Sequence, residues 1–304
     1  MVKPGYMCAQ NKKPVIIDCH THAWTPEDWD MIRQLGPAMD PDLEDDSPYN
    51  WTPRFEGTIH NLRRNEKAAG IDRFVLLPAS SKPERSIELS RWAADLARYY
   101  PEIIAFGALH PLGETLDQDV AEILNLGLPG IKIHSLVQRI DPVSDQSLKM
   151  FALVEKAGLV VLMDSMSLMG AAALKPNLEP FMNEAQKIGI ETTPEKIAEL
   201  VRRFPKLKII AAHMGYMYGW HLLDPIINLD QVYFDISYVH RLISPDLAMD
   251  LIRKKGVERI VFGTDAPYRR PEKALAWFMD LPLTPGEQER ILGMNLLELL
   301  AKQI

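Results

Sequence analysis

Residues 15–24 read VIIDCHTHAW, an apolar run that ends in two histidines one residue apart, His20 and His22. Side chains on a β-strand alternate between its two faces. We therefore expect Asp18, His20 and His22 to share one face and Cys19 to point to the other. Two imidazoles on one face of a strand can bind a divalent metal ion. Such a site needs more ligands, which the rest of the chain must supply.

Composition narrows the class of protein. The chain has 304 residues, 47% of them apolar, which is enough for a large core. The formal charge of −7 comes without a basic block, so neither nucleic acid nor an anionic membrane is expected as a partner. The two cysteines, Cys8 and Cys19, form no spaced metal motif and predict a reduced, cytoplasmic protein. Residues 1–13 lack the apolar core of a signal peptide, no later run is long enough to span a bilayer, and we expect a loose N-terminal arm.

Short β-branched runs alternate with helical patterns along the chain. The predicted strands are Val15–Asp18, Arg73–Pro78, Ile103–Leu109, Gly130–His134, Leu159–Met163, Lys208–Ala212, Val232–Ile236 and Arg259–Phe262. Strands that alternate with helices predict a parallel sheet covered on both faces. At this length a (β/α)8 TIM barrel is the simplest such fold. An open doubly wound sheet is the alternative, but no Gly-rich phosphate loop follows the first strand.

Two connections are longer than a barrel requires. Residues 23–56 follow the first strand, and residues 165–193 follow the fifth. Long loops after barrel strands usually carry function and lie on the face where active sites form. We therefore predict that both cap the pocket. With no internal repeat and no linker, residues 1–304 are expected to form one domain.

Polar side chains recur where the predicted strands end. His134 and Lys132 share one face at the end of the fourth strand, and Asp164 follows the fifth. His213 follows the sixth strand and Asp265 the eighth. The carboxyl ends of barrel strands meet at one mouth, so these side chains are expected to converge there with the first-strand histidines.

The motifs at these strand ends form a recognisable set. They are DCHTH at 18–22, GIKIH at 130–134, PKLKIIAAHMG at 205–215, VYFDIS at 232–237, RIVFGTDAP at 259–267 and the closing segment 295–300. Together they resemble the amidohydrolase superfamily, most closely the amidohydrolase-2 branch that includes aminocarboxymuconate-semialdehyde and resorcylate decarboxylases. The resemblance implies a TIM-barrel hydrolase or lyase with one divalent ion, zinc first and manganese second.

One position departs from that pattern. The family usually has a histidine ligand at the end of the fifth strand, where this chain has Asp164. Aspartate can ligate zinc or manganese through oxygen. The change shifts the preference from zinc toward manganese or magnesium, or leaves the site without a metal.

The resemblance implies a role for each polar residue. The expected metal ligands are His20, His22, Asp164 and Asp265. Asp265 is also expected to accept a proton from a water whose pKa the ion lowers. His213 is the expected acid–base residue. The ordinary alternatives are a helix cap for Asp265 and a buried, hydrogen-bonded imidazole for His213.

Other residues near the mouth suit the substrate. The candidates are His134, Lys132, Arg139, Arg241 and Arg269. A guanidinium fork binds a carboxylate well, so the arginines predict a substrate that carries one. The alternatives are solvated surface arginines and, for His134 and Lys132, simple packing.

Three functions remain open from the sequence. The first is a metal-dependent hydrolase of a small amide, ester or lactone, acting through a water that the ion activates. The second is a metal-dependent, non-oxidative decarboxylase of an aromatic or unsaturated acid. The third is a degenerate barrel that binds a ligand without catalysis. The expected partner is a small molecule, and the resemblance adds a homodimer.

Overall fold

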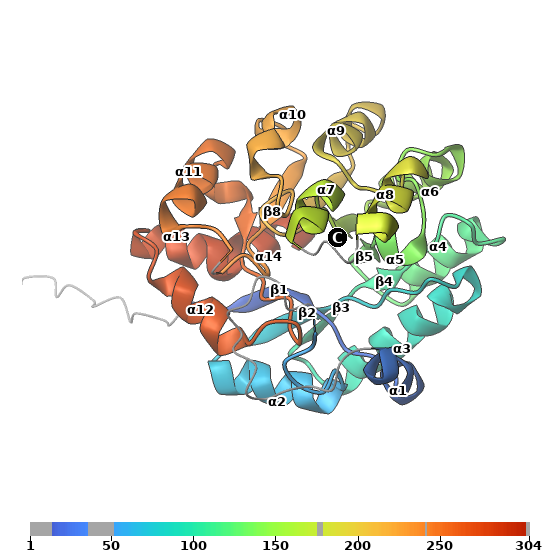
Figure 1. Ribbon diagram of the computed structural model, residues 1–304. Helices are drawn as coiled ribbons and strands as arrows, with labels where there is room; N and C mark the ends of the chain where they lie inside the picture. The colour runs from blue at the N-terminus through green and yellow to red at the C-terminus, as the bar shows by residue number, and fades with distance from the viewer. Residues whose placement is uncertain (1–13, 36–51, 175–178, 241, 302–304) are drawn as a thin grey trace, which may run out of the picture.

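The computed structural model describes residues 14–35, 52–174, 179–240 and 242–301. Figure 1 shows helices arranged around the outside of a central ring of strands. The predicted N-terminal arm and Arg241 lie outside the described residues, as do 36–51 and 175–178 of the two long connections.

The strands follow one another in the predicted order. They are β1 (Ile17–Thr21), β2 (Arg73–Leu76), β3 (Ile103–Ala105), β4 (Gly107–Ala108), β5 (Gly130–Ile133), β6 (Val160–Met163), β7 (Lys208–Ala211), β8 (Val232–Asp235) and β9 (Ile260–Val261). Every pairing between them is parallel. The predicted third strand is split at Phe106 into β3 and β4.

The paired strands form two sheets, of order β1-β2-β3 and β4-β5-β6-β7-β8-β9. The sheets adjoin at Phe106, where the chain passes directly from one to the other. At the other side, the Cys19 amide donates to the Phe262 carbonyl (2.9 Å), and Thr21 pairs with Ala266. These contacts place β1 beside the end of β9, so the predicted TIM-barrel class is confirmed.

Helices follow most strands and pack around them (Figure 1). They are α1 (Pro26–Leu35), α2 (Ile59–Ala69), α3 (Ser86–Tyr99), α4 (Leu116–Asn125), α5 (Ser135–Gln138), α6 (Asp145–Ala157), α7 (Leu168–Leu174), α8 (Glu179–Lys187), α9 (Pro194–Arg203), α10 (Asp224–Ile227), α11 (Pro245–Lys255), α12 (Pro271–Met279), α13 (Pro285–Glu289) and α14 (Asn295–Ala301). Hydroxyl side chains fix several helix starts: Thr58 accepts from the Asn61 amide and Ser244 from the Leu247 amide. Among the described residues, none of the helices has both the length and the apolar character to cross a bilayer.

The interior of the ring is apolar below the strand ends. Side chains from strands all round it meet there, including Ile17, Val75, Phe106 and Leu162. Leu296 of α14 joins the same cluster. This packing closes the amino-terminal end of the barrel and leaves the carboxyl end for polar side chains.

The expected alternation along the first strand is wrong in one respect. The pairing of β1 with β2 shifts by one residue between Asp18 and Thr21, which marks a β-bulge. Cys19 packs with the interior cluster, yet His20 also reaches inward, to Asp235 of β8. The bulge therefore brings two consecutive side chains to the interior, whereas a regular strand would send one of them outward.

Candidate active site

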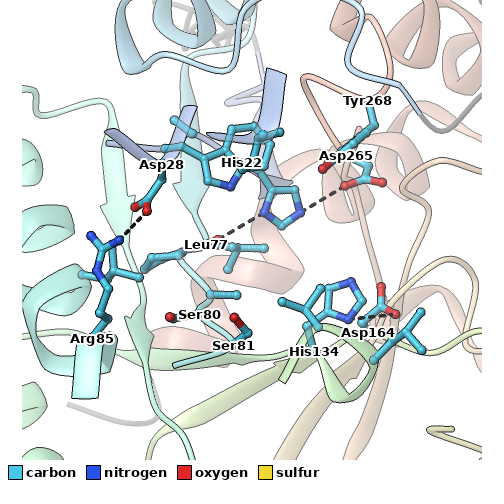
Figure 2. Close-up of a pocket in the computed structure, with 18 of the residues that line it drawn as sticks. His22, Asp28, Leu77, Ser80, Ser81, Arg85, His134, Asp164, Asp265 and Tyr268 are labelled. Carbon is cyan, nitrogen blue, oxygen red and sulfur yellow. Dashed lines mark hydrogen bonds and ion pairs between the residues drawn. The ribbon is translucent and has the colours of Figure 1, made fainter. Parts of the chain in front are cut away.

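A cavity of about 580 Å³ opens at the carboxyl ends of the strands. Its polar wall comes from side chains that follow five different strands: His22, His134, Asp164, His213 and Asp265. In Figure 2 the pairs His22–Asp265 and His134–Asp164 lie on the same side of the cavity. The predicted convergence of strand-end residues is therefore present in the structure.

Three of the predicted ligands form one compact group, His20, His22 and Asp265. The Asp265 Oδ1 atom lies 3.6 Å from His20 Nε2 and 3.2 Å from His22 Nε2. Both imidazoles use their other nitrogen for an oxygen acceptor: His20 Nδ1 bonds Asp235 Oδ2 (2.8 Å), and His22 Nδ1 bonds the Leu77 carbonyl (3.1 Å). Such partners fix the tautomer that leaves Nε2 free for a metal. These three residues fit a divalent ion.

Lys132 approaches the same group from the barrel interior. Its Nζ lies 3.1 Å from His20 Nε2, and the side chain is buried. The ammonium donates to the lone pair that an ion at His20 would use. Lys132 does not line the cavity. In this structure it contacts His20 and does not face a substrate.

The second pair at the site is His213 with Asp164. His213 Nε2 lies 3.0 Å from Asp164 Oδ1, and His213 Nδ1 faces the Ser237 carbonyl at 3.2 Å. A carboxylate and a carbonyl can only accept hydrogen bonds. The Ser237 hydroxyl also lies 2.9 Å from His213 Nδ1, but its single proton is donated to Asp235, so here it too can only accept. Both ring nitrogens of His213 therefore carry a proton, and the pair is an imidazolium with a carboxylate. Asp164 stands in neither of the three-residue groups that could hold an ion among the described residues.

The pKa values agree with this assignment. Burial lowers the pKa of His213, but the hydrogen bond and charge of Asp164 outweigh it and raise that pKa to about 9. Burial raises the pKa of Asp164, but His134 and His213 hold it well below its usual range. Burial and the Lys132 charge lower the pKa of His20 to about 4. At neutral pH His213 is charged and His20 is not.

Asp265 and His134 complete the polar wall. Burial alone would raise the pKa of the Asp265 carboxyl, but His20 and His22 lower it, so the group is ionised. His134 Nδ1 lies 3.7 Å from Asp164 Oδ2. Burial lowers the pKa of His134 to about 4, so it faces the cavity as a neutral imidazole.

Asp235 connects the two histidine pairs, and the sequence reasoning did not assign it. Its carboxylate accepts from His20 Nδ1 and from the amides of His213 (2.8 Å) and Ser237 (3.0 Å). The Ser237 hydroxyl also donates to it, at 2.6 Å. The sequence did hold a signal for this role, the single acid within VYFDIS. A carboxylate on an otherwise apolar interior strand must find buried hydrogen-bond donors.

The backbone is strained where it presents two of these side chains. His213 and Asp265 adopt φ values of 59° and 67°, in the left-handed region that residues other than glycine rarely use. The Asp265 amide donates to the His20 carbonyl (2.8 Å), and the His213 amide donates to Asp235. These bonds hold both residues in place, as is common at functional sites.

The predicted substrate arginines lie elsewhere. Arg139 is exposed at the end of α5, and Arg269 is buried with its guanidinium 3.7 Å from the centre of the Tyr238 ring. Neither lines the cavity. Arg139 faces solvent, and the guanidinium of Arg269 packs against Tyr238, whose ring itself lines the cavity.

The sequence reasoning missed most of the rest of the cavity wall, apart from Trp24 and Met166, which lie in the two connections predicted to cap the pocket. Its apolar part includes Trp24, Leu136, Met166, Met217 and Tyr268. A polar part follows β2 and consists of Ser80, Ser81, Lys82 and Arg85. The position of these residues, just after the second strand, could have identified them, because every such loop opens on the barrel mouth. Trp24 and Met166 belong to the two long connections, whose predicted capping role stays a prediction.

Solved structures of similar shape are known. A 5-carboxyvanillate decarboxylase from Novosphingobium aromaticivorans, with bound manganese, has a TM-score of 0.72 at 15% identity, over 96% of this chain and 99% of its own. A dihydroxybenzoic acid decarboxylase from Polaromonas, with bound manganese and 2-nitroresorcinol, has a TM-score of 0.70 at 17% identity, over 96% and 98%. A probable 2-pyrone-4,6-dicarboxylic acid hydrolase from Acinetobacter baumannii has a TM-score of 0.61 at 14% identity, over 94% and 99%. Comparison with curated proteins found no sequence relative.

The parallel strands and the His/Asp group at their carboxyl ends define the class, a barrel enzyme with a candidate metal centre. The amidohydrolase family model matches residues 17–301, so the chain belongs to this family. The solved structures agree in fold, and they include both lyases and a hydrolase.

Proposed function

We propose that this protein is a metal-dependent lyase that removes CO2 from an aromatic or unsaturated carboxylic acid. The observation that carries the proposal is the His213–Asp164 pair, which holds a proton between Nε2 and Oδ1 at 3.0 Å, on the cavity wall. Decarboxylation needs an acid that protonates the carbon left by CO2. A histidine that is already protonated at neutral pH is suited to that task.

The other residues of the cavity support the same reaction. A divalent ion held by His20, His22 and Asp265 would supply the positive charge that binds the substrate carboxylate. Trp24 and Tyr268 present aromatic rings to the cavity, their centroids 6.0 Å apart and nearly perpendicular. Such walls hold a flat ring and exclude water.

The proton balance is simple. When the bond between the ring carbon and the carboxylate breaks, its electron pair stays on the carbon. The carbon then takes the proton from the His213–Asp164 pair, and CO2 leaves. Neutral His134, beside Asp164, can hydrogen-bond a hydroxyl or carbonyl oxygen of the substrate.

Hydrolysis of an ester or lactone is the second candidate, and Asp265 favours it. Its carboxylate is ionised and faces the cavity, so it can accept a proton from an attacking water. The His213–Asp164 pair would then protonate the leaving oxygen. Hydrolysis would use the same side chains as decarboxylation, but it would need Asp265 as a base in addition to the His213–Asp164 pair as the acid.

Product analysis in D2O separates these functions. The manganese-loaded protein is incubated with 2,6-dihydroxybenzoate, 5-carboxyvanillate or 2-pyrone-4,6-dicarboxylic acid, the compounds that the similar proteins suggest. We expect CO2 from an aromatic acid and one deuterium on the ring carbon, and at least a hundredfold slower release in His213→Asn. The matched control is His60→Ala, an exposed histidine on α2.

Other outcomes would contradict the proposal. Opening of the pyrone without CO2 release would make the protein a hydrolase. Binding of these acids with no turnover of any of them would make it a binding barrel.

A further inference from the structure

The cavity has a second polar end that the reaction centre does not use. The loop after β2 places Ser80, Ser81, Lys82 and Arg85 on its wall. In Figure 2 Arg85 lies across the cavity from Asp265, with His22 between them, and the hydroxyls of Ser80 and Ser81 lie between Arg85 and His134. A small monocarboxylic acid at the centre would leave this end empty.

We propose that Ser80, Ser81 and Lys82 form a second anion-binding subsite and that the substrate is a dicarboxylic acid. The inference rests on the proposed function, since the first carboxylate binds at the metal centre. The subsite would bind the second carboxylate, at the other end of a ring or a short unsaturated chain.

The charges of the loop support an anion. Arg85 is already engaged, since it pairs with Asp28 of α1 and, at 3.3 Å, with Glu88. Lys82 has no carboxylate partner in the part of the chain that the structure describes. The exposed ammonium is therefore an available donor. The Ser80 hydroxyl accepts from the Lys82 amide at 3.0 Å and keeps its own proton to donate. Two acids of α1 also line the cavity: Asp28, which Arg85 neutralises, and Glu27, which opposes a bound anion.

The distance between the two ends suits a small molecule. The Leu77 carbonyl bonds His22 Nδ1, so the β2 loop begins at the metal centre. Ser80 follows three residues later, and three extended residues span at most about 10 Å. The residues between them, Pro78 and Ala79, line the cavity and are apolar. An anion at each end and an apolar middle describe a dicarboxylic acid.

Calorimetry on the full, manganese-loaded chain tests the subsite with two ligands of similar shape. Terephthalate carries a second carboxylate where 4-methylbenzoate carries a methyl group. We expect terephthalate to bind about tenfold more tightly, the size of one hydrogen bond to a charged group. Lys82→Gln should abolish this preference, and Glu27→Gln should increase it. Lys149→Gln, an exposed lysine of α6, is the matched control and should leave it unchanged.

The outcomes keep the two proposals apart. Equal affinity for both ligands in the wild type, or an unchanged preference in Lys82→Gln, would overturn the subsite. In His22→Ala both ligands should weaken by the same factor. If His22→Ala binds 4-methylbenzoate as the wild type does, the proposed centre is wrong even where the Lys82 preference stands.

Discussion

At the scale of single residues, His213 is the group whose chemistry depends most on its neighbours. Acceptors face both of its ring nitrogens. Asp164 lies at Nε2, and Nδ1 meets the Ser237 carbonyl and the Ser237 hydroxyl, whose proton goes to Asp235. His20, whose ring stacks on His213 with centroids 5.2 Å apart, has one acceptor and one donor instead. Two stacked imidazoles thus have opposite charge states because their hydrogen-bond partners differ.

This difference predicts how stability depends on pH. In chelator-treated protein, His213 has a pKa of about 9 when folded and near 6.5 when unfolded. Its stabilisation is therefore complete below pH 6.5 and is lost as the pH rises through 9. We expect the melting temperature of the wild type to fall by several degrees over this range, as followed by scanning calorimetry.

Asp164→Asn is the control for that experiment. The variant lacks the carboxylate that raises the pKa of His213, so the alkaline decline should be smaller. Parallel declines in both proteins would show that Asp164 does not set the charge of His213. The same variant tests the predicted ligand role, because metal content that falls with the substitution would make Asp164 a ligand.

At the scale of elements, the site needs the end of β9 close to β1. A Cβ at Gly263 would lie 3.1 Å from His20 Cβ and 3.2 Å from both Cys19 Sγ and Ser237 Cβ. These distances are shorter than ordinary packing contacts, and the neighbours carry or adjoin the candidate ligands. The glycine therefore allows the close approach that positions His20.

Gly263→Ala should push these elements apart. We expect a loss of about 1–2 kcal/mol of stability and weaker metal binding, measured by denaturant unfolding and metal titration. Gly286→Ala is the matched control, because a Cβ there meets nothing within 4 Å. If both variants bind metal like the wild type, the close approach is not needed for the centre.

A second element depends on Glu191, which anchors the connection after β6. Its buried carboxylate accepts from the Leu168 amide at 3.0 Å, from Gln186 Nε2 at 3.4 Å and from the Tyr216 hydroxyl. The anchor joins the start of α7 to the segment after β7. Met166 and Met217, which pair across these segments, line the cavity.

Glu191→Ala would leave these donors buried without an acceptor. We expect a loss of about 2–3 kcal/mol of stability and weaker binding of aromatic acids, as thermal melting and calorimetry would show. Glu184→Ala, at an exposed position of α8, should change neither. An unchanged melting temperature in Glu191→Ala would mean that the connection is held by its apolar contacts alone.

At the scale of the whole molecule, the barrel interior contains several buried ionisable groups. Asp235, Asp265, Lys132 and His213 are all buried at the carboxyl end of the barrel. Buried charges are costly unless partners compensate them. An ion bound by His20, His22 and Asp265 would add positive charge beside two carboxylates.

Removal of the ion should therefore destabilise the protein. At an ion concentration of about one hundred times Kd, binding contributes about 2.7 kcal/mol, so chelation should lower the melting temperature by about 5 °C. Zinc or manganese should restore it, and metal analysis by mass spectrometry should give one ion per chain. His20→Ala should lose the ion, whereas His60→Ala should keep it. Equal metal content in all three proteins would place the ion elsewhere.

The homodimer stays a prediction that sedimentation would test.

Sequence alone determined the barrel and the positions at which its polar side chains gather. Strand ends can be recognised because β-branched runs and helical patterns are local signals, and parallel connection then places all carboxyl ends together. That is how His20, His22, His213 and Asp265 were found before any geometry was known.

Only the tertiary structure decided what those side chains do to one another. Asp164 and His213 are separated by 49 residues and His20 and Asp235 by 215, and no local pattern says which pairs will touch. The bulge in β1 shows the same limit, since a shift of one residue changed which side chains face inward. The charge states and tautomers of the site residues depend on contacts within about 4 Å. The same is true of the composition of each end of the cavity. Such contacts exist only once the chain has folded.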